Sequence, residues 1–145
     1  MFNHPAAILE PEVDGDSSVR ARSCVGIGQD VPVTEQANRP WGSYAVLTEA
    51  DDFKVKTLTI QPGQRLSYQK HSRRSEHWFV VRGTGVVTLD GKTLEMRRGD
   101  AVDVPVGVAH RVHNTGQVPL VFVEVQHGDY FGEDDIVRLD DDYGR

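Results

Sequence analysis

The chain has 145 residues, a formal net charge of −6 and 38% apolar residues. This length favours a single domain with a buried core, and the negative charge argues against nucleic acid or an anionic membrane surface as a partner. The single cysteine, Cys24, excludes an internal disulfide and a thiolate metal cluster. Because no signal peptide and no membrane-length apolar run is present, we expect a cytoplasmic protein.

Two regions differ in composition. Residues 1–37 are polar, rich in Pro, Gly, Asp and Ser, and without periodicity, which predicts an N-terminal arm. Residues 38–145 hold short runs of Val, Thr, Leu and aromatic residues separated by turn formers, which predicts a domain built from strands. The predicted strands include residues 53–60, 76–82, 85–90, 92–97, 101–106, 110–114 and 119–126.

The turn residues and the C-terminal tail give further predictions about the fold. Asp90-Gly91 stands between two alternating runs and predicts a tight hairpin. Many short strands without a long helical period predict an all-β sandwich or barrel. The tail from residue 132 is acidic, but Ile136, Val137, Leu139 and Tyr143 suggest that part of it docks on the domain.

Two spaced motifs lie inside the strand-rich region. The first consists of Gly63, Gln69, His71, Glu76 and Gly83. The second consists of Gly99, Pro105, Gly107, His110 and Asn114. In order and spacing they resemble the two cupin motifs, except that Gln69 stands where many cupins carry the first histidine. The resemblance implies an all-β cupin fold, which is a double-stranded β-helix or jelly-roll barrel.

The same residues suit a metal site on physical grounds. Gln69 and His71 are two residues apart on a strand and face the same side. Glu76 enters the next strand and His110 a later one, so a closed sheet can bring all four together. Imidazole, carboxylate and amide ligands fit a divalent ion, with zinc first and Co, Ni, Mn or Fe as alternatives. His77 and His113 have the opposite parity and are expected outside the site.

A narrower resemblance covers residues 39–145. The stretches "RPWGSYAVL", "SEHW" and "GEDDIVR…DYGR" resemble the C-terminal cupin domain of type II phosphomannose isomerases, also called mannose-6-phosphate isomerases. The resemblance implies interconversion of mannose 6-phosphate and fructose 6-phosphate through an enediol, and a homodimer. In that family the domain commonly follows a nucleotidyltransferase domain, whose glycine-rich start is not seen here. We therefore expect a stand-alone isomerase module without guanylyl transfer.

The resemblance also suggests roles for individual side chains. The metal ligands would be Gln69, His71, Glu76 and His110. Arg138, in "EDDIVR", is the first candidate for the phosphate or the enediolate, and Lys56 is the second. Glu124 is a candidate base for the C2 proton, with a paired structural carboxylate as an equal alternative. Arg74 is a candidate for substrate binding or for a salt bridge with Glu76, and Arg73 for substrate binding if it reaches the lumen.

Two other functions are compatible with the same motifs. One is a different metal-dependent cupin enzyme, such as a dioxygenase, because one fold carries many chemistries. The other is a non-catalytic module that binds a small phosphorylated sugar. Oxygen consumption with bound iron would favour the first, and ligand binding without turnover would favour the second.

Overall fold

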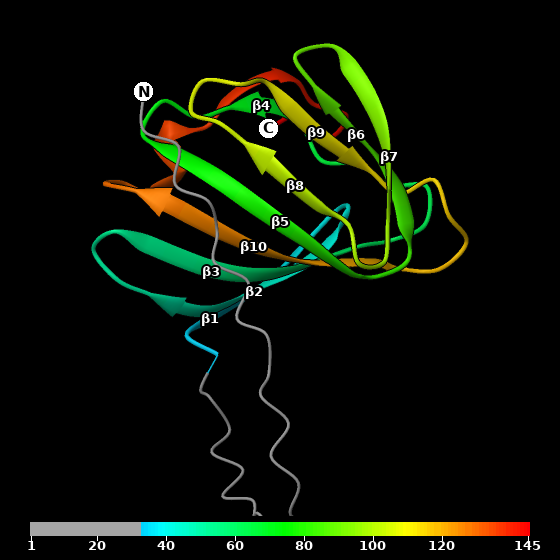
Figure 1. The fold of residues 1–145 in the computed structure, drawn as a ribbon, viewed down its shortest axis with the longest axis horizontal. Coiled ribbons are helices and arrows are strands. Elements are labelled where there is room, and N and C mark those ends of the chain that lie inside the picture. Colours follow the sequence, from blue (N-terminus) through cyan, green and yellow to red (C-terminus); the bar gives the residue numbers. More distant parts are fainter. Residues whose placement is uncertain (1–32) are drawn as a thin grey trace, which may run out of the picture.

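The structure is a computed structural model that describes residues 33–145, which form two antiparallel β-sheets packed face to face (Figure 1). One sheet has six strands in the order β1-β2-β3-β10-β5-β8, and the other has five in the order β11-β4-β9-β6-β7. The strands are β1 (Glu35–Arg39), β2 (Gly42–Glu49), β3 (Phe53–Ile60), β4 (Tyr68–Lys70), β5 (Arg74–Arg82), β6 (Thr84–Leu89), β7 (Lys92–Arg97), β8 (Ala101–Val104), β9 (His110–His113), β10 (Leu120–Gly128) and β11 (Val137–Asp140). A short 3-10 helix, η1 (Glu133–Asp135), precedes β11. The predicted all-β architecture is confirmed.

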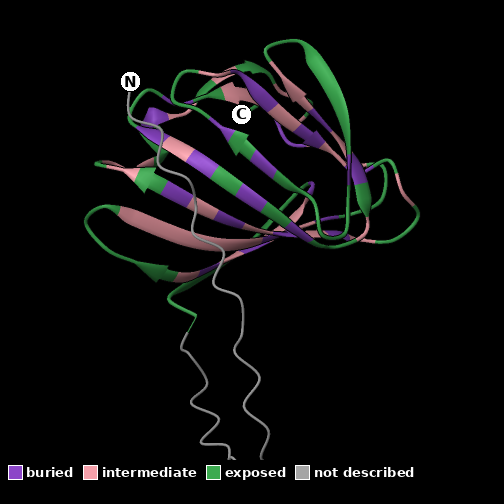
Figure 2. Cartoon of the chain, viewed as in Figure 1, coloured by how far each residue is buried: buried purple, intermediate pink, exposed green. Residues whose placement is uncertain are grey.

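The central strands of the six-stranded sheet bury every second residue. In β5, Glu76, Trp78 and Val80 are buried, whereas His77 and Phe79 between them are exposed. Figure 2 shows the same alternation of buried and less buried residues along β10. Because side chains on a strand alternate between two faces, the strand register decides which of them reach the interior.

The interior is apolar at one end and polar at the other. β5 and β10 are antiparallel, so that Phe122 lies opposite Val80 at the apolar end and Gln126 lies opposite Glu76 at the polar end. The fully buried apolar side chains include Ile60, Val80, Val87, Met96, Val112, Leu120 and Phe122. The apolar end holds the two sheets together by burying hydrocarbon surface, and the polar end is where a functional site can form.

The hairpin predicted at Asp90-Gly91 joins β6 to β7. Both residues have positive φ angles, 44° for Asp90 and 80° for Gly91, as a two-residue hairpin turn with the right-handed strand twist requires. The Asp90 carboxylate also accepts a hydrogen bond from the backbone N–H of Ala109 at 2.8 Å. The turn is thereby tied to the loop that leads into β9.

Both ends of the described chain add strands to the sheets. β1 includes residues 35–37, which the sequence places in the arm, and it pairs with β2; residues 1–32 of the predicted arm lie outside the described residues. The tail docks as predicted, because β11 pairs with β4 and Tyr143 packs against the core. Val137 pairs with Lys70 through its backbone, but the side chains of Val137 and Leu139 face outward, since these residues are 49% and 51% exposed. Among residues 33–145, no helix is long and apolar enough to cross a bilayer.

Phe122→Ala is expected to lower the free energy of unfolding by about 3–5 kcal/mol, because it leaves a cavity beside Trp78, whose ring centre is 5.4 Å away. Phe79→Ala serves as the matched control. Phe79 lies on the outer face of β5 and is 45% exposed, so its loss should change the free energy by about 0.5 kcal/mol or less. Urea denaturation followed by fluorescence measures both, and equal losses would contradict the burial assigned to the two faces.

Candidate metal and active site

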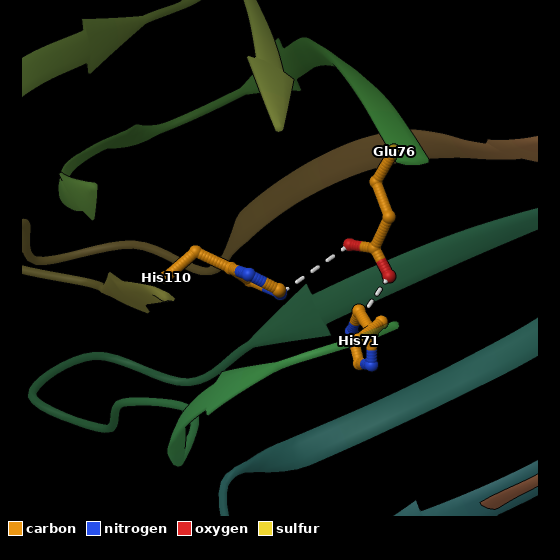
Figure 3. Close-up of side chains that lie close together, drawn as sticks. All are labelled: His71, Glu76 and His110. Carbon is orange, nitrogen blue, oxygen red and sulfur yellow. Dashed lines mark ion pairs between the residues drawn. The ribbon is translucent and has the colours of Figure 1, made fainter. Parts of the chain in front are cut away.

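Three buried side chains of the kind that bind metals converge from different parts of the chain (Figure 3). Glu76 lies near the start of β5, His110 is the first residue of β9, and His71 follows the end of β4. Their ligand atoms all lie within 4.8 Å of one another. Glu76 Oε1 is 3.0 Å from His71 Nε2, and Glu76 Oε2 is 3.6 Å from His110 Nε2. We call these residues the His71–Glu76–His110 group.

Backbone carbonyl groups orient both imidazole rings. His110 Nδ1 lies 2.9 Å from the carbonyl oxygen of Val108, and His71 Nδ1 lies 3.3 Å from that of Asp135. Because a carbonyl oxygen only accepts hydrogen bonds, each Nδ1 carries a proton, and each Nε2 faces Glu76, where it presents a lone pair whenever the ring is neutral. His110 Nε2 is buried and has no hydrogen-bond partner. Both rings thus offer the nitrogen that faces Glu76 as a ligand atom.

This donor set fits a divalent cation. When both Nε2 atoms carry lone pairs, they and the Glu76 carboxylate repel one another unless a positive charge lies nearby. The guanidinium group of Arg74 supplies part of that charge, with Nε 3.4 Å from Glu76 Oε1 and Nη2 3.4 Å from His71 Nε2. Imidazole and carboxylate are ligands typical of zinc and of other first-row divalent ions.

Gln69, the fourth predicted ligand, lies beside this group. Its Cα pairs with that of His110 between β4 and β9, and its side chain lines the same cavity as Glu76 and His110. Gln69 Oε1 accepts a hydrogen bond from Ser67 Oγ at 2.7 Å, which leaves the second lone pair of that oxygen for another partner. His71 does not line the cavity, but its Nε2 contacts Glu76 and Arg74, which do.

A second buried carboxylate, Glu124 on β10, lies close to Glu76. Trp78 Nε1 is 3.1 Å from Glu76 Oε2 and 3.1 Å from Glu124 Oε2, so one indole N–H is shared by two carboxylates. Gln126 Nε2 donates to Glu124 Oε1 at 2.7 Å. Glu124 is therefore both a cavity-lining group and a hydrogen-bonded member of the core.

The two carboxylates have pKa values displaced in opposite directions. Burial and the charge of Glu76 raise the pKa of Glu124 to about 8, although Lys56 opposes this rise. Burial alone would also raise the pKa of Glu76, but a hydrogen bond from His71 when its ring is protonated, together with the guanidinium charge of Arg74, holds it below its usual range. Burial lowers the pKa of His110, which favours the neutral imidazole that binds metal. Paired carboxyl groups with separated pKa values are typical of acid–base sites.

Several cations line the same cavity. They are Arg39, Lys56, Arg74, Arg138 and Arg145. Arg138 on β11 lies opposite Gln69 in the β11–β4 pair, and its Nε is buried without a hydrogen-bond partner. Lys56 and Arg39 lie against the ring of Tyr44, at 4.9 Å and 5.2 Å from the ring centre. Lys56, Arg74, Arg138 and Glu124, which the sequence offered as candidate site residues, thus line one cavity.

The remaining candidate, Arg73, points away from the cavity. Its Nε donates to Asp129 at 3.1 Å, its guanidinium lies 4.7 Å from the centre of the Tyr130 ring, and its side chain is 51% exposed. The structure therefore gives no support to a substrate-binding role for Arg73. The alternation of faces counted from Gln69 does not reach Arg73, because the chain leaves β4 at Lys70 and enters β5 only at Arg74. In β5 the alternation begins again with Arg74 buried.

Sequence reasoning did not select two of the lining cations. Arg39 and Arg145 lie at opposite ends of the folded chain, and both line the cavity. Arg39 is the first residue of "RPWG" and Arg145 the last of "DYGR". Because these stretches carry the family resemblance, they could have indicated both arginines as candidate site residues. His77, by contrast, lies on the outer face as expected, where its Nδ1 is 2.5 Å from Asp103 Oδ1.

The two-sheet barrel and the His71–Glu76–His110 group together define a cupin, and solved structures share this fold. A protein with a double-stranded beta-helix domain from Klebsiella pneumoniae superposes with a TM-score of 0.60 at 23% identity, over 67% of this chain and 83% of that one. The capsular polysaccharide assembling protein CapF from Staphylococcus aureus superposes with a TM-score of 0.64 at 23% identity, over 74% of this chain and 34% of that one. At this identity the likeness concerns the fold alone.

Residues 28–141 match the family described as "Mannose-6-phosphate isomerase C-terminal", and the chain belongs to this family. The alginate biosynthesis protein AlgA of Pseudomonas aeruginosa is 50% identical over 107 residues, which are 74% of this chain and 22% of that protein. The xanthan biosynthesis protein XanB of Xanthomonas campestris is 48% identical over 74% of this chain and 23% of its own length. The mannose-1-phosphate guanylyltransferase of Escherichia coli is 42% identical over 78% of this chain and 24% of its own length. The chain thus spans less than a quarter of the length of these relatives.

Metal-stripped protein is expected to bind Zn²⁺ and to melt at a higher temperature when the ion is restored, since a ligand at 100 times its Kd stabilises the folded state by about 2.7 kcal/mol. His110→Ala should lose most of this effect because it removes one ligand nitrogen. His113→Ala, three residues along the same strand, is the control and should bind as the wild type does. Calorimetric titration and thermal melting measure both, and unchanged binding by His110→Ala would place the ion elsewhere.

Proposed function

We propose that this domain is a metal-dependent aldose–ketose isomerase that interconverts mannose 6-phosphate and fructose 6-phosphate. The observation that carries the proposal concerns buried side-chain atoms without a hydrogen-bond partner. Among residues 33–145 these atoms are His110 Nε2, Gln126 Oε1 and Arg138 Nε, and all three residues line one cavity. Unpaired buried polar atoms are costly, so their clustering indicates a ligand that pairs with them.

The three atoms differ in hydrogen-bonding character, so each suits a different kind of partner. The lone pair of His110 Nε2 suits a cation, the acceptor Gln126 Oε1 suits a hydroxyl group, and the donor Arg138 Nε suits an anion. A sugar phosphate with a divalent ion supplies all of them. Membership of the mannose-6-phosphate isomerase family supports the choice of sugar.

The reaction moves one hydrogen between neighbouring carbons. When bound at the His71–Glu76–His110 group, a divalent cation, zinc by preference, supplies the positive charge that polarises the sugar oxygens and stabilises an enediolate. Glu124 takes the proton from C2 of the aldose and returns it to C1, while a proton passes from the C2 hydroxyl group to the C1 oxygen. The raised pKa of Glu124 suits a group that both accepts and donates a proton near neutrality.

The phosphate group has several cations available. Arg138 is the first candidate because its guanidinium offers a free buried donor, and Arg forms paired hydrogen bonds with phosphate oxygens. Lys56 is the second, and the Tyr44 ring beside it restricts where its ammonium group can lie. Arg74 is better suited to neutralising Glu76, because its Nε already lies 3.4 Å from Glu76 Oε1.

Zinc-loaded protein given mannose 6-phosphate should produce fructose 6-phosphate, followed by a coupled assay. Arg138→Ala should lower kcat/KM by about 100-fold, since a charge-assisted hydrogen bond to a phosphate is worth roughly 1.5–3 kcal/mol. Arg82→Ala, an exposed arginine on β5, is the control and should retain activity. Binding of the sugar phosphate without turnover would favour the non-catalytic module, and oxygen consumption by iron-loaded protein would favour a dioxygenase.

Glu124→Gln tests the proton transfer separately from binding. The isosteric amide cannot take the C2 proton, so isomerisation and exchange of that hydrogen with deuterated water should both fall by about 100-fold or more. The affinity for mannitol 6-phosphate, which has no carbonyl group to isomerise, should change little. Loss of both binding and activity would instead assign Glu124 the structural role of a paired carboxylate.

A further inference from the structure

Gln126 is a buried amide that presents one unpaired atom to the cavity. It lies on β10 and is 1% exposed, and its Oε1 has no hydrogen-bond partner. Its side chain lines the same cavity as Glu76, Glu124 and His110. A buried acceptor without a donor destabilises the protein unless a ligand supplies that donor.

The hydrogen bonds of ionised Glu124, the form that acts as a base, orient the Gln126 amide. Trp78 Nε1 can only donate, and it donates to Glu124 Oε2 at 3.1 Å. In the carboxylate form both Glu124 oxygens only accept, and Glu124 Oε1 accepts the amide N–H of Gln126 at 2.7 Å. With its nitrogen held by Glu124, Gln126 directs its oxygen toward the ligand space. The hydrogen bonds that link Trp78, Glu124 and Gln126 thus hold the Gln126 oxygen in one orientation.

The position of Gln126 indicates which part of a sugar it meets. Its Cα pairs with that of Glu76, so its side chain emerges beside the His71–Glu76–His110 group. It is also hydrogen-bonded to Glu124, the proposed base for C1 and C2. With C1 and C2 at Glu124, the nearest hydroxyl group that takes no part in the proton transfer is the one on C3.

We propose that Gln126 Oε1 accepts a hydrogen bond from the C3 hydroxyl group of the sugar phosphate and makes the site selective for a hydroxyl group at that carbon. This inference rests on the proposed function and adds a specificity-determining residue to it. A ligand without the C3 hydroxyl leaves Gln126 Oε1 unpaired in a closed site, which is the situation in which enzymes discriminate strongly between substrates.

The test compares two ligands across matched variants by calorimetry on zinc-loaded protein. The ligands are mannitol 6-phosphate and its 3-deoxy analogue, neither of which can be isomerised. Wild type and the control Gln117→Met, at an exposed loop position, should bind the 3-deoxy analogue about 10- to 100-fold more weakly than the parent. In Gln126→Met the acceptor is gone, so the ratio of the two Kd values should fall to near one.

A general structural effect of the substitution would weaken both ligands and leave their ratio unchanged, which would overturn the inference. Gln126→Asn provides a second variant that keeps an amide but withdraws its oxygen, and it should also reduce the ratio. A ratio near one in the wild type would equally refute the role of Gln126 while leaving the isomerase proposal intact. Failure of the wild type to bind mannitol 6-phosphate at all would instead refute the proposed sugar-phosphate site.

Discussion

The polar interior of this domain depends on one shared hydrogen-bond donor. The indole N–H of Trp78 lies 3.1 Å from a carboxylate oxygen of Glu76 and 3.1 Å from one of Glu124. Two buried carboxylates so close together cannot both carry an uncompensated charge. The Glu76 charge is compensated by the guanidinium group of Arg74, whereas Glu124 has a raised pKa. One constraint therefore yields an ionised carboxylate at Glu76 and a carboxyl group of raised pKa at Glu124.

The C-terminal segment completes the site from outside the central strands. The Asp135 carboxylate accepts hydrogen bonds from the backbone N–H groups of Ser72 and Arg73, and its carbonyl oxygen faces His71 Nδ1. Two residues after η1, β11 pairs with β4 and carries Arg138 into the cavity. The tail thus orients one imidazole of the His71–Glu76–His110 group and supplies a cation. Its acidic composition is explained by these contacts and by ion pairs of Asp140 and Asp142 with arginines of the barrel.

The His71–Glu76–His110 group alone does not distinguish an isomerase from other cupins, because the same residue types suit several reactions. What distinguishes this cavity is the remainder of its lining. An unpaired guanidinium nitrogen and an unpaired amide oxygen match a phosphate group and a hydroxyl group, which a dioxygenase substrate need not carry. Family membership points to the same class of ligand. Chemistry and ancestry thus support one substrate class through independent observations.

The sequence by itself determined the β-class and the Asp90-Gly91 hairpin and predicted that His71, Glu76 and His110 converge, because strand parity and motif spacing are local properties. It could not determine that Arg73 points outward and Arg74 inward, since the turn between β4 and β5 resets the parity. Only the tertiary structure showed that Arg39 and Arg145 line one cavity and that Gln126 has an unpaired oxygen. These features depend on strand pairing between distant segments. A local sequence pattern does not show which buried polar atoms are left without a hydrogen-bond partner after that pairing.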